Sequence, residues 1–372
     1  MKTINGTPFL LDGLTIKESS FKDDFKIATI HNNNGNTTRG DGTSFNKVLA
    51  LKGAMGELLE RVTQTKLSHK IKVDNIQGYN IKNDEIVTVS AEEVLLVNSN
   101  LYEELPDNYW SDSSGTAFHR NSYDVIDSSF LEFIERQSLV FNWLTKTPGE
   151  NIIVDRFLKG KGIETIYRNL KSYFNDIFTF NISISQHCYV IITIATGPNI
   201  KSVGLGAGWT IESALYKSLK ETWQLTGDYK PNHFPELHPT NLLEPYLNET
   251  SRNGNIYHDY FASLSKEEVL EEYNYLSGRK NNSVSIKKNQ SERPSEKLLI
   301  KKLKDIGDEL STELIIVYIP SIIEEFPGIV VKILGNGAFP HIKTDIINPL
   351  NYTINGINKR DVPNQGRMVP FS

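Results

Sequence analysis

The sequence predicts an α/β fold of mixed β-sheets and amphipathic helices, and three observations support this prediction. Apolar residues recur at helical spacing over residues 45–64 and 127–144. Runs rich in β-branched residues, such as residues 86–90 and 188–195, are typical of strands. Stretches of small residues precede three of the expected helices. Helices and strands that alternate in this way favour an α/β class over an all-α or all-β one.

Composition limits the classes of protein to consider. The 372 residues suffice for one large domain, and we expect a single domain over residues 1–372 whose subregions 1–110, 111–245 and 246–372 contribute to one cleft. The net charge of −5 and the lack of a basic tract argue against nucleic-acid binding. A single cysteine, Cys188, excludes an internal disulfide and a multi-cysteine metal site. No apolar run is long enough for a membrane span and no export signal is evident, so we expect a cytoplasmic protein.

The order of the expected elements follows from these patterns. Residues 31–44 and 202–208 are interpreted as glycine loops, and residues 113–117 as a small-residue loop. Helices are expected at residues 45–64, 127–144, 163–174, 209–225 and 265–276. Strands are expected within residues 1–30 and at residues 86–90, 94–97, 178–184, 189–196, 314–319 and 328–334. A polar stretch over residues 279–294 is expected to be a surface loop.

One phrase recurs on three of these helices. It reads Glu57-x-x-Glu60-Arg61, then Glu132-x-x-Glu135-Arg136, then Glu221-x-x-Gln224. Residues three and four apart share a helical face, so each phrase presents a polar stripe. A single copy is typical of an exposed, salt-bridged helix. Three copies, each at the same separation from a preceding small residue (Gly42, Ala117 and Gly206), favour a shared site instead.

The residue types of the phrase suit a nucleotide that is bound through Mg²⁺. Crowded carboxylates repel one another and take up protons unless a cation compensates them. Mg²⁺ prefers hard oxygen ligands, a few from the protein and the rest from phosphate and water. Glycine loops at helix starts offer backbone N–H groups to phosphate, and arginine adds charge. The chain has no Gly-x-x-x-x-Gly-Lys-Ser/Thr and no protein-kinase motif set, so it is neither a P-loop protein nor a protein kinase.

These motifs resemble the YcaO family, whose pattern is two helices that end in Glu-x-x-Glu-Arg and a later Glu-x-x-Gln helix. Within the family, residues 117–119, 131–139, 143–144 and 368–371 look most like the cyclodehydratase subunits of microcin-type thiazole/oxazole synthetases. The resemblance is strongest over residues 42–62 and 113–144 and weakest over residues 245–345. It implies a YcaO-type fold with the motif helices around a central ATP and Mg²⁺ cleft.

The resemblance implies an ATP-dependent enzyme of bacteriocin-type peptide biosynthesis. Cys, Ser or Thr of a ribosomal precursor peptide would become thiazoline or oxazoline after phosphorylation of a backbone amide oxygen. It also implies partners: the precursor peptide, a ubiquitin-activating-like subunit that binds the leader, and an FMN-dependent azoline dehydrogenase in a hetero-oligomer. Three alternatives stay open: a YcaO enzyme that forms a thioamide or amidine, a non-catalytic docking scaffold, and a small-molecule ATP ligase.

Roles for individual residues follow from the same resemblance. The implied Mg²⁺ ligands are Glu57, Glu60, Glu132, Glu135 and Glu221. The implied ATP-binding residues are Glu57, Glu60, Arg61, Asp124, Arg136, Glu221, Gln224 and Lys332. The implied catalytic residues are Glu132, Glu135, Arg136 and Ser372.

The C-terminal part departs from the family pattern. The usual late Pro-Gly-x-x-Glu is missing, and residues 335–340 stand in its place without a glutamate. The C-terminal metal ligand is therefore unassigned. The Pro-x-Pro-x-Pro tail of many azoline-forming members is also missing, although residues 370–372 keep its final part.

Overall fold

The chain forms two compact units, each built from segments that are distant in the sequence. A computed structural model describes residues 13–18, 26–32, 38–70, 75–96, 111–159, 161–198, 200–226, 256–278, 292–320 and 328–371. Unit 1 consists of Met1–Arg136 and Pro294–His341, and unit 2 of Gln137–Arg293 and Ile342–Ser372. The expected single domain around one cleft stays a prediction.

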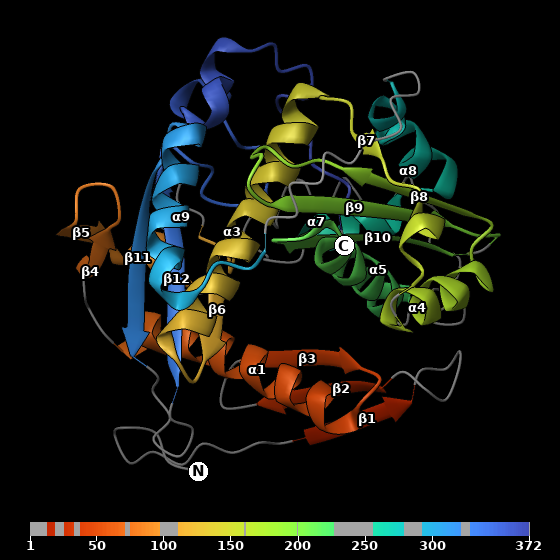
Figure 1. Cartoon of the computed structure of the whole chain (residues 1–372), viewed down its shortest axis with the longest axis horizontal. Coiled ribbons are helices and arrows are strands. Elements are labelled where there is room, and N and C mark those ends of the chain that lie inside the picture. The colour runs from red at the N-terminus through yellow and green to blue at the C-terminus, as the bar shows by residue number, and fades with distance from the viewer. Residues whose placement is uncertain are drawn as a thin grey trace. The chain divides into compact units, whose positions relative to one another are not determined.

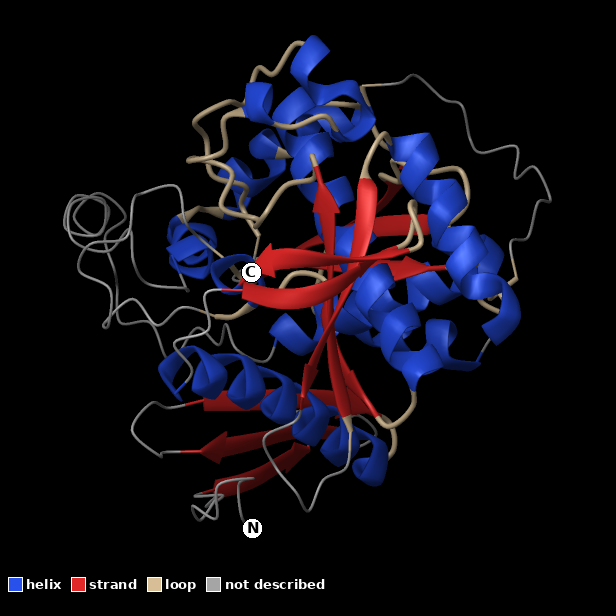
Figure 2. Cartoon of the chain, turned by 90° about the vertical axis from the view of Figure 1, so that its left-hand side faces the viewer, coloured by secondary structure: helices blue, strands red, loops and turns tan. Residues whose placement is uncertain are grey.

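A three-stranded sheet and one long helix form the first part of unit 1. Strands β1 (Gly13–Glu18), β2 (Lys26–Asn32) and β3 (Thr38–Ser44) are antiparallel neighbours in the order β1-β2-β3. Helix α1 (Lys47–Lys70) lies along this sheet (Figures 1 and 2). Its buried residues Ala50, Ala54, Leu58, Leu59 and Val62 form a core cluster on which Phe118 packs.

A five-stranded antiparallel sheet forms the second part of unit 1. Its order is β5-β4-β11-β12-β6. The strands are β4 (Asn75–Asn80), β5 (Glu85–Ser90), β6 (Thr116–His119), β11 (Glu313–Pro320) and β12 (Ile329–Asn336). The short α2 (Ala91–Val94) follows β5, and α9 (Glu296–Leu310) precedes β11. Helix α3 (Ser122–Thr145) begins in unit 1 and ends in unit 2.

Unit 2 contains a four-stranded antiparallel sheet in the order β10-β9-β8-β7. The strands are β7 (Glu150–Asn151), β8 (Asp176–Asn181), β9 (Tyr189–Thr196) and β10 (Lys201–Gly208). The helices are α4 (Lys161–Lys171), α5 (Ile211–Thr226), α7 (Ile256–Ser263) and α8 (Lys266–Glu272). Cys188 is free and buried. None of the helices in the described ranges combines the length and apolarity that a bilayer crossing needs.

The two expected glycine loops are strands, which corrects the sequence interpretation. Residues 38–44 form β3 and residues 201–208 form β10. A side chain at Gly42 would collide with the backbone of Ala50 and Ala54 in α1, and one at Gly206 with the backbone of Ala214 and Ser218 in α5. The glycines therefore serve close strand–helix packing. The strand expected at residues 94–97 is also wrong at its start, because residue 94 ends the helix α2. Residues 116 and 117 of the expected small-residue loop belong to β6, and α7 and α9 were not expected.

Substitution of Gly42 tests this packing. We expect Gly42→Ala to destabilise the protein by about 2–4 kcal/mol, because the helix backbone cannot yield to a methyl group. Gly53→Ala, on the facing helix α1, is the matched control, because a Cβ there meets its nearest atom at 3.4 Å, an ordinary contact. Thermal unfolding measures both. Equal melting temperatures for the two variants would contradict the packing argument.

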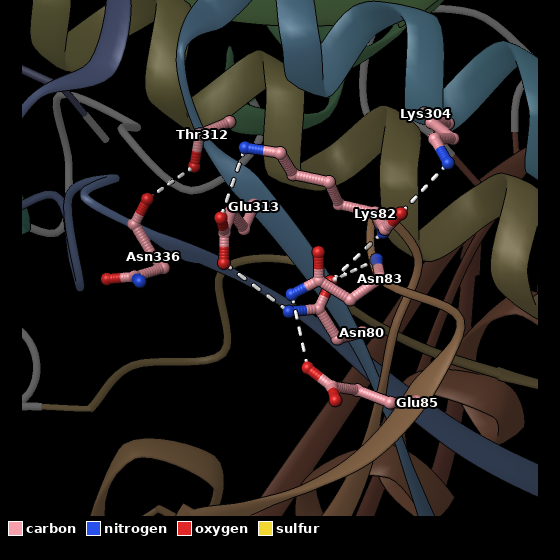
Figure 3. Close-up of polar contacts among 8 residues, drawn as sticks. All are labelled: Asn80, Lys82, Asn83, Glu85, Lys304, Thr312, Glu313 and Asn336. Atoms are coloured by element: carbon pink, nitrogen blue, oxygen red, sulfur yellow. Dashed lines mark hydrogen bonds and ion pairs between the residues drawn. The ribbon is translucent and has the colours of Figure 1, made fainter.

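The turn between β4 and β5 is held by a polar network (Figure 3). Glu313 at the start of β11 accepts from Lys82 Nζ at 3.1 Å and from Asn80 Nδ2 at 3.4 Å. Lys304 of α9 donates to the Lys82 carbonyl at 2.8 Å. Hydrogen bonds from Lys82 and Asn80 hold the pKa of Glu313 below its usual value. The network fixes the hairpin against α9 and β11.

The C-terminal segment is fixed inside unit 2. Trp143 of α3 donates its indole N–H to the Arg367 carbonyl at 3.1 Å, and the Tyr273 hydroxyl donates to the Pro370 carbonyl at 2.7 Å. The side chain of Phe371 is buried. The last described residues are therefore ordered by specific partners rather than by secondary structure.

Candidate active site

Helix α1 places the first acidic pair. Glu57 and Glu60 are three residues apart and face the same side of the helix. Glu57 accepts from the backbone N–H of Asp41 at 2.7 Å and forms an ion pair with Arg61 at 2.6 Å. Both Glu57 oxygens are thus engaged within unit 1, one by the strand and one by the arginine.

Helix α3 places the second acidic pair. Its position is set by Ser129, whose hydroxyl donates to the Gly115 carbonyl at 2.5 Å, an oxygen that also accepts from the Ile333 N–H at 2.8 Å. Glu132 follows one turn later and is partly buried. Arg136 lies 3.8 Å from Glu135, with 18% and 13% of their side chains exposed. A nearly buried arginine beside carboxylates is suited to hold phosphate oxygens.

Strand β12 adds a buried cation. The Lys332 side chain is 1% exposed. Its ammonium donates to the Ser111 hydroxyl and to the Asp112 carbonyl, both at 2.7 Å. Lys332 is the register partner of Thr116 in β6, so the two residues share one face of the sheet. Gln64 of α1 donates to Thr116 at 2.9 Å on that face.

The charges of these side chains act on one another. Burial raises the pKa of Glu60 well above its usual value, and the neighbouring Glu132 and Glu57 raise it further. Burial raises the pKa of Glu132 to about 8, with Glu135, Asp112 and Glu57 adding to the rise and Arg136 opposing it. Burial lowers the pKa of Lys332 to about 8, against the pull of Asp112, Glu132 and Glu60. We call Glu60, Asp112, Glu132 and Lys332 the carboxylate–lysine cluster.

The raised pKa of Glu132 predicts a pH-dependent stability. Between the ordinary glutamate pKa of 4.5 and about 8, the folded state keeps a proton that the unfolded state releases. Folding stability of the metal-free protein therefore falls as the pH rises through this window. We expect Glu132→Gln, which cannot ionise, to melt about 3 °C or more above wild type at pH 8 and at a similar temperature at pH 5. If the difference in melting temperature between the variant and wild type does not increase with pH, the pKa of Glu132 is not raised in the folded state.

The structure brings some of the expected residues together and leaves others elsewhere. Glu60, Glu132 and Lys332 meet in the cluster, with Glu57, Arg61, Glu135 and Arg136 on the same two helices. Asp124 lies in the first turn of α3, where it accepts from Asn121 at 2.7 Å. Glu221 and Gln224 lie on α5 in unit 2, where Glu221 accepts from the Leu205 N–H at 2.5 Å. Ser372 lies outside the described residues.

Sequence reasoning missed two residues that hold Lys332. Ser111 and Asp112 stand directly before the small-residue stretch at 113–117. Their closeness in sequence to the motif helix α3 could have indicated a role in the site. The lysine that they bind, however, comes more than two hundred residues later in the sequence. Only the pairing of β12 with β6 brings them together.

The cluster has the chemistry of a Mg²⁺ site completed by phosphate. Within the described residues, no three His, Cys, Asp or Glu side chains are arranged to hold a metal ion by themselves. Mg²⁺ bound to a nucleotide does not need such a set, because one or two carboxylates, phosphate oxygens and water complete its shell. Burial raises the pKa values of Glu60 and Glu132 despite the basic side chains near them, so a divalent ion would further stabilise their charged forms.

Comparison with solved structures agrees with this fold. The chain superposes on the YcaO protein from Methanopyrus kandleri bound with AMPPCP and Mg²⁺ with a TM-score of 0.67 at 15% identity, covering 89% of this chain and 86% of that one. It superposes on a chain of the Escherichia coli microcin synthetase McbBCD complex with pro-MccB17 bound with a TM-score of 0.68 at 20% identity, covering 96% of both.

Comparison of sequences identifies the family. The chain is 29% identical over 164 residues to the Escherichia coli microcin B17-processing protein McbD, a match that spans 42% of this chain and only 41% of that relative. Residues 60–310 match the family described as YcaO cyclodehydratases that bind ATP and Mg²⁺. That match covers α3 with its Glu-x-x-Glu-Arg phrase, α5, and the second half of the phrase on α1. The chain therefore belongs to the ATP- and Mg²⁺-binding YcaO cyclodehydratase family.

Proposed function

We propose that this chain is the cyclodehydratase subunit of a peptide-modifying synthetase. It converts Cys, Ser or Thr residues of a ribosomal precursor peptide to thiazoline or oxazoline rings at the expense of ATP. The observation that supports this proposal is the carboxylate–lysine cluster, in which Glu60 and Glu132 act on the buried Lys332 in a chain of this family.

The proposed reaction balances without an oxidant. The substrate thiol or hydroxyl loses its proton and adds to the preceding carbonyl carbon, and the carbonyl oxygen then takes the γ-phosphoryl group of ATP while ADP leaves. Phosphate then leaves with that oxygen, the amide nitrogen loses its proton, and a C=N bond closes the ring. When bound, Mg²⁺ and ATP supply the electrophilic phosphoryl group and neutralise part of its charge.

The side chains of the cluster have separate roles in this proposal. Glu60 and Glu132, with Glu135, hold Mg²⁺, and both must release a proton to do so. Arg136, an arginine of α3 with 18% of its side chain exposed, binds phosphate oxygens. Lys332 is a fixed positive charge, held by Ser111 and Asp112, that faces the same carboxylates. The roles of Gln224 and Ser372 stay proposals from the family resemblance.

The partners are part of the proposal. The McbBCD synthetase contains a chain with this fold in a complex with its precursor, pro-MccB17. By analogy, a ubiquitin-activating-like subunit binds the leader of this chain's precursor peptide, and an FMN-dependent dehydrogenase oxidises the azolines. We also propose a cytoplasmic location.

A reconstituted reaction tests the function. The chain is incubated with the precursor peptide, the two partner subunits, ATP and Mg²⁺, without FMN. We expect the peptide to lose the mass of one water per ring, with one phosphate released for each. Phosphate release without any mass loss would contradict ring formation, and a mass gain from a sulfur for oxygen exchange would indicate a thioamide-forming enzyme instead.

A further inference from the structure

Helices cover one face of the five-stranded sheet over only part of its width. Leu314 of β11 faces α9, because a Cβ on Gly307 of that helix would lie 3.5 Å from the Leu314 side chain. Gly335 of β12, the register partner of Leu314, lies against Phe133 of α3 on the same face. The strands at the other end of the sheet, β4 and β5, lie beyond α9 (Figure 1). The covering layer of helices therefore ends at α9 within the described part of unit 1.

The exposure of one row of side chains rises as the row leaves α9. Ile316 of β11 pairs with Tyr79 of β4, and Tyr79 pairs with Ile86 of β5, so the three side chains share this face. Ile316 is 2% exposed, Tyr79 is partly exposed, and Ile86 is 65% exposed. Tyr318 lies on the same face of β11 and is 44% exposed. We call Tyr79, Ile86, Thr88 and Tyr318 the open face.

The opposite face of the same strands is buried. Val89 of β5 belongs to a core cluster with Val94 of α2 and Val317 of β11. Successive strand residues point to opposite faces, so β5 has one buried side and one open side. Apolar side chains on a sheet face are usually buried by a second layer of structure. The described elements leave Ile86 without such a layer.

The flank of α9 beside the open face is basic. Lys304 donates to the Lys82 carbonyl in the β4–β5 turn at 2.8 Å, so this side of α9 faces the hairpin (Figure 3). Lys301 and Lys297 precede Lys304 by three and seven residues and therefore share its side of the helix. All three lysines are exposed, and Asp308 ends the row. We call Lys297, Lys301 and Lys304 the lysine row.

The acids of the hairpin and its neighbouring strand have other partners. Glu313 pairs with Lys82 at 3.1 Å, and Asp84 accepts from the Tyr79 hydroxyl at 2.6 Å. Glu85 accepts from a side-chain amide within the turn at 3.1 Å. Among the described residues, none of these acids forms an ion pair with the lysine row. The row therefore offers its charge to acidic groups of another molecule.

We propose that the open face and the lysine row dock an amphipathic helix with an acidic flank, contributed by a partner protein. The apolar side of this helix covers Ile86 and Tyr79, and its acids pair with the lysine row. Neighbouring strands are about 4.8 Å apart, so β5 lies about 10 Å from β11, which is close to the spacing of packed helices. The docked helix thus extends the layer of α3 and α9. That the partner is another synthetase subunit rests on the proposed function, whereas the chemistry of the surface does not.

Two synthetic peptides test the chemistry of this surface. Both are amphipathic helices of about 18 residues with leucine at helical spacing, and their flanks carry glutamate in one and lysine in the other. We expect the full chain to bind the glutamate peptide about tenfold more tightly than the lysine peptide in calorimetry at low salt. Ile86→Asp and Lys301→Glu should each weaken binding of the glutamate peptide by about tenfold. The control is Lys159→Glu, an exposed lysine outside α9, which should bind as wild type does.

Hydrogen exchange and sedimentation distinguish other occupants of the surface. A docked helix leaves the outward amides of the edge strand β5 free to exchange, whereas a strand added to that edge protects them. Self-association of the chain that is lost in Ile86→Asp would identify a second copy as the occupant. Equal binding of the two peptides, protection of β5, or such self-association would each overturn the proposal.

The reconstituted synthetase tests the partner. Ile86→Asp and Lys301→Glu should weaken association of the chain with a partner subunit by about tenfold, while Lys159→Glu should not. Association of both variants at the wild-type affinity would overturn the proposal. If the wild-type chain binds no subunit, the proposed synthetase fails, and the peptide experiment still decides whether the surface docks an acidic helix.

Discussion

Glu132→Gln lowers ATP-dependent ring formation by about 10³-fold while the protein stays folded. Glutamine has the size of glutamate and is neutral, like the protonated form that burial favours at Glu132, whose pKa is raised to about 8. The substitution therefore changes the free energy of unfolding only slightly. Glutamine cannot supply the negative charge that Mg²⁺ requires of its ligand, and the charge on the transferred phosphoryl group is then poorly compensated. Mass spectrometry of the precursor peptide and thermal unfolding measure the two effects.

The control for this variant is Glu164→Gln. Glu164 lies on α4 and pairs with Arg168 four residues later, with 37% of its side chain exposed. Exposed ion pairs on a helix contribute little to stability, so ring formation and the melting temperature should stay near the wild-type values. Wild-type turnover in Glu132→Gln would show that α3 does not carry the metal site.

Lys332→Met lowers ring formation by about 10²-fold, with a melting temperature equal to or above that of wild type. Burial is the largest cause of the lowered pKa of Lys332, so its ammonium is costly to hold inside the protein. Methionine fills a similar volume without that cost. It also removes the positive charge that acts on Glu60 and Glu132, on which the proposed reaction depends.

Two further variants sharpen this result. Lys304→Met on α9 removes an exposed lysine that binds a carbonyl, and should leave ring formation near wild type. We expect wild-type ring formation to fall above pH 8 as Lys332 loses its proton. Lys332→Arg keeps the charge at all accessible pH values, so it should restore part of the activity and abolish this expected fall. Full activity of Lys332→Met would show that Lys332 has no role in the reaction.

Much of the fold was predictable where local pattern and burial agree. The apolar spacing on α3 and α5 indicated both helices, and the β-branched run of β9 indicated a fully buried strand. β3 and β10 were interpreted as loops because glycine has a low strand propensity. Their strand structure depends on α1 and α5 packing against the glycines, which is a tertiary effect that no local pattern reveals.

The candidate site was predictable only in part. The spacing of Glu57, Glu60, Glu132 and Glu135 indicated two acidic helix faces, and the structure couples Glu60 with Glu132 electrostatically. Lys332 entered only through the family resemblance, since one lysine in a strand has no distinctive pattern. Its holders, Ser111 and Asp112, were missed because their contact depends on strands that pair across most of the chain. The role of Ser372 stays a prediction.

The strand–helix junctions also show that one arrangement occurs twice in the chain. β1, β2, β3 and α1 in unit 1 have the same order and pairing as β8, β9, β10 and α5 in unit 2. In both, an acid on the helix accepts from a strand N–H sixteen residues earlier, and glycines bring the strand close to the helix backbone. The same backbone geometry is therefore specified by two different sequences, with the acid and the glycines at matching separations.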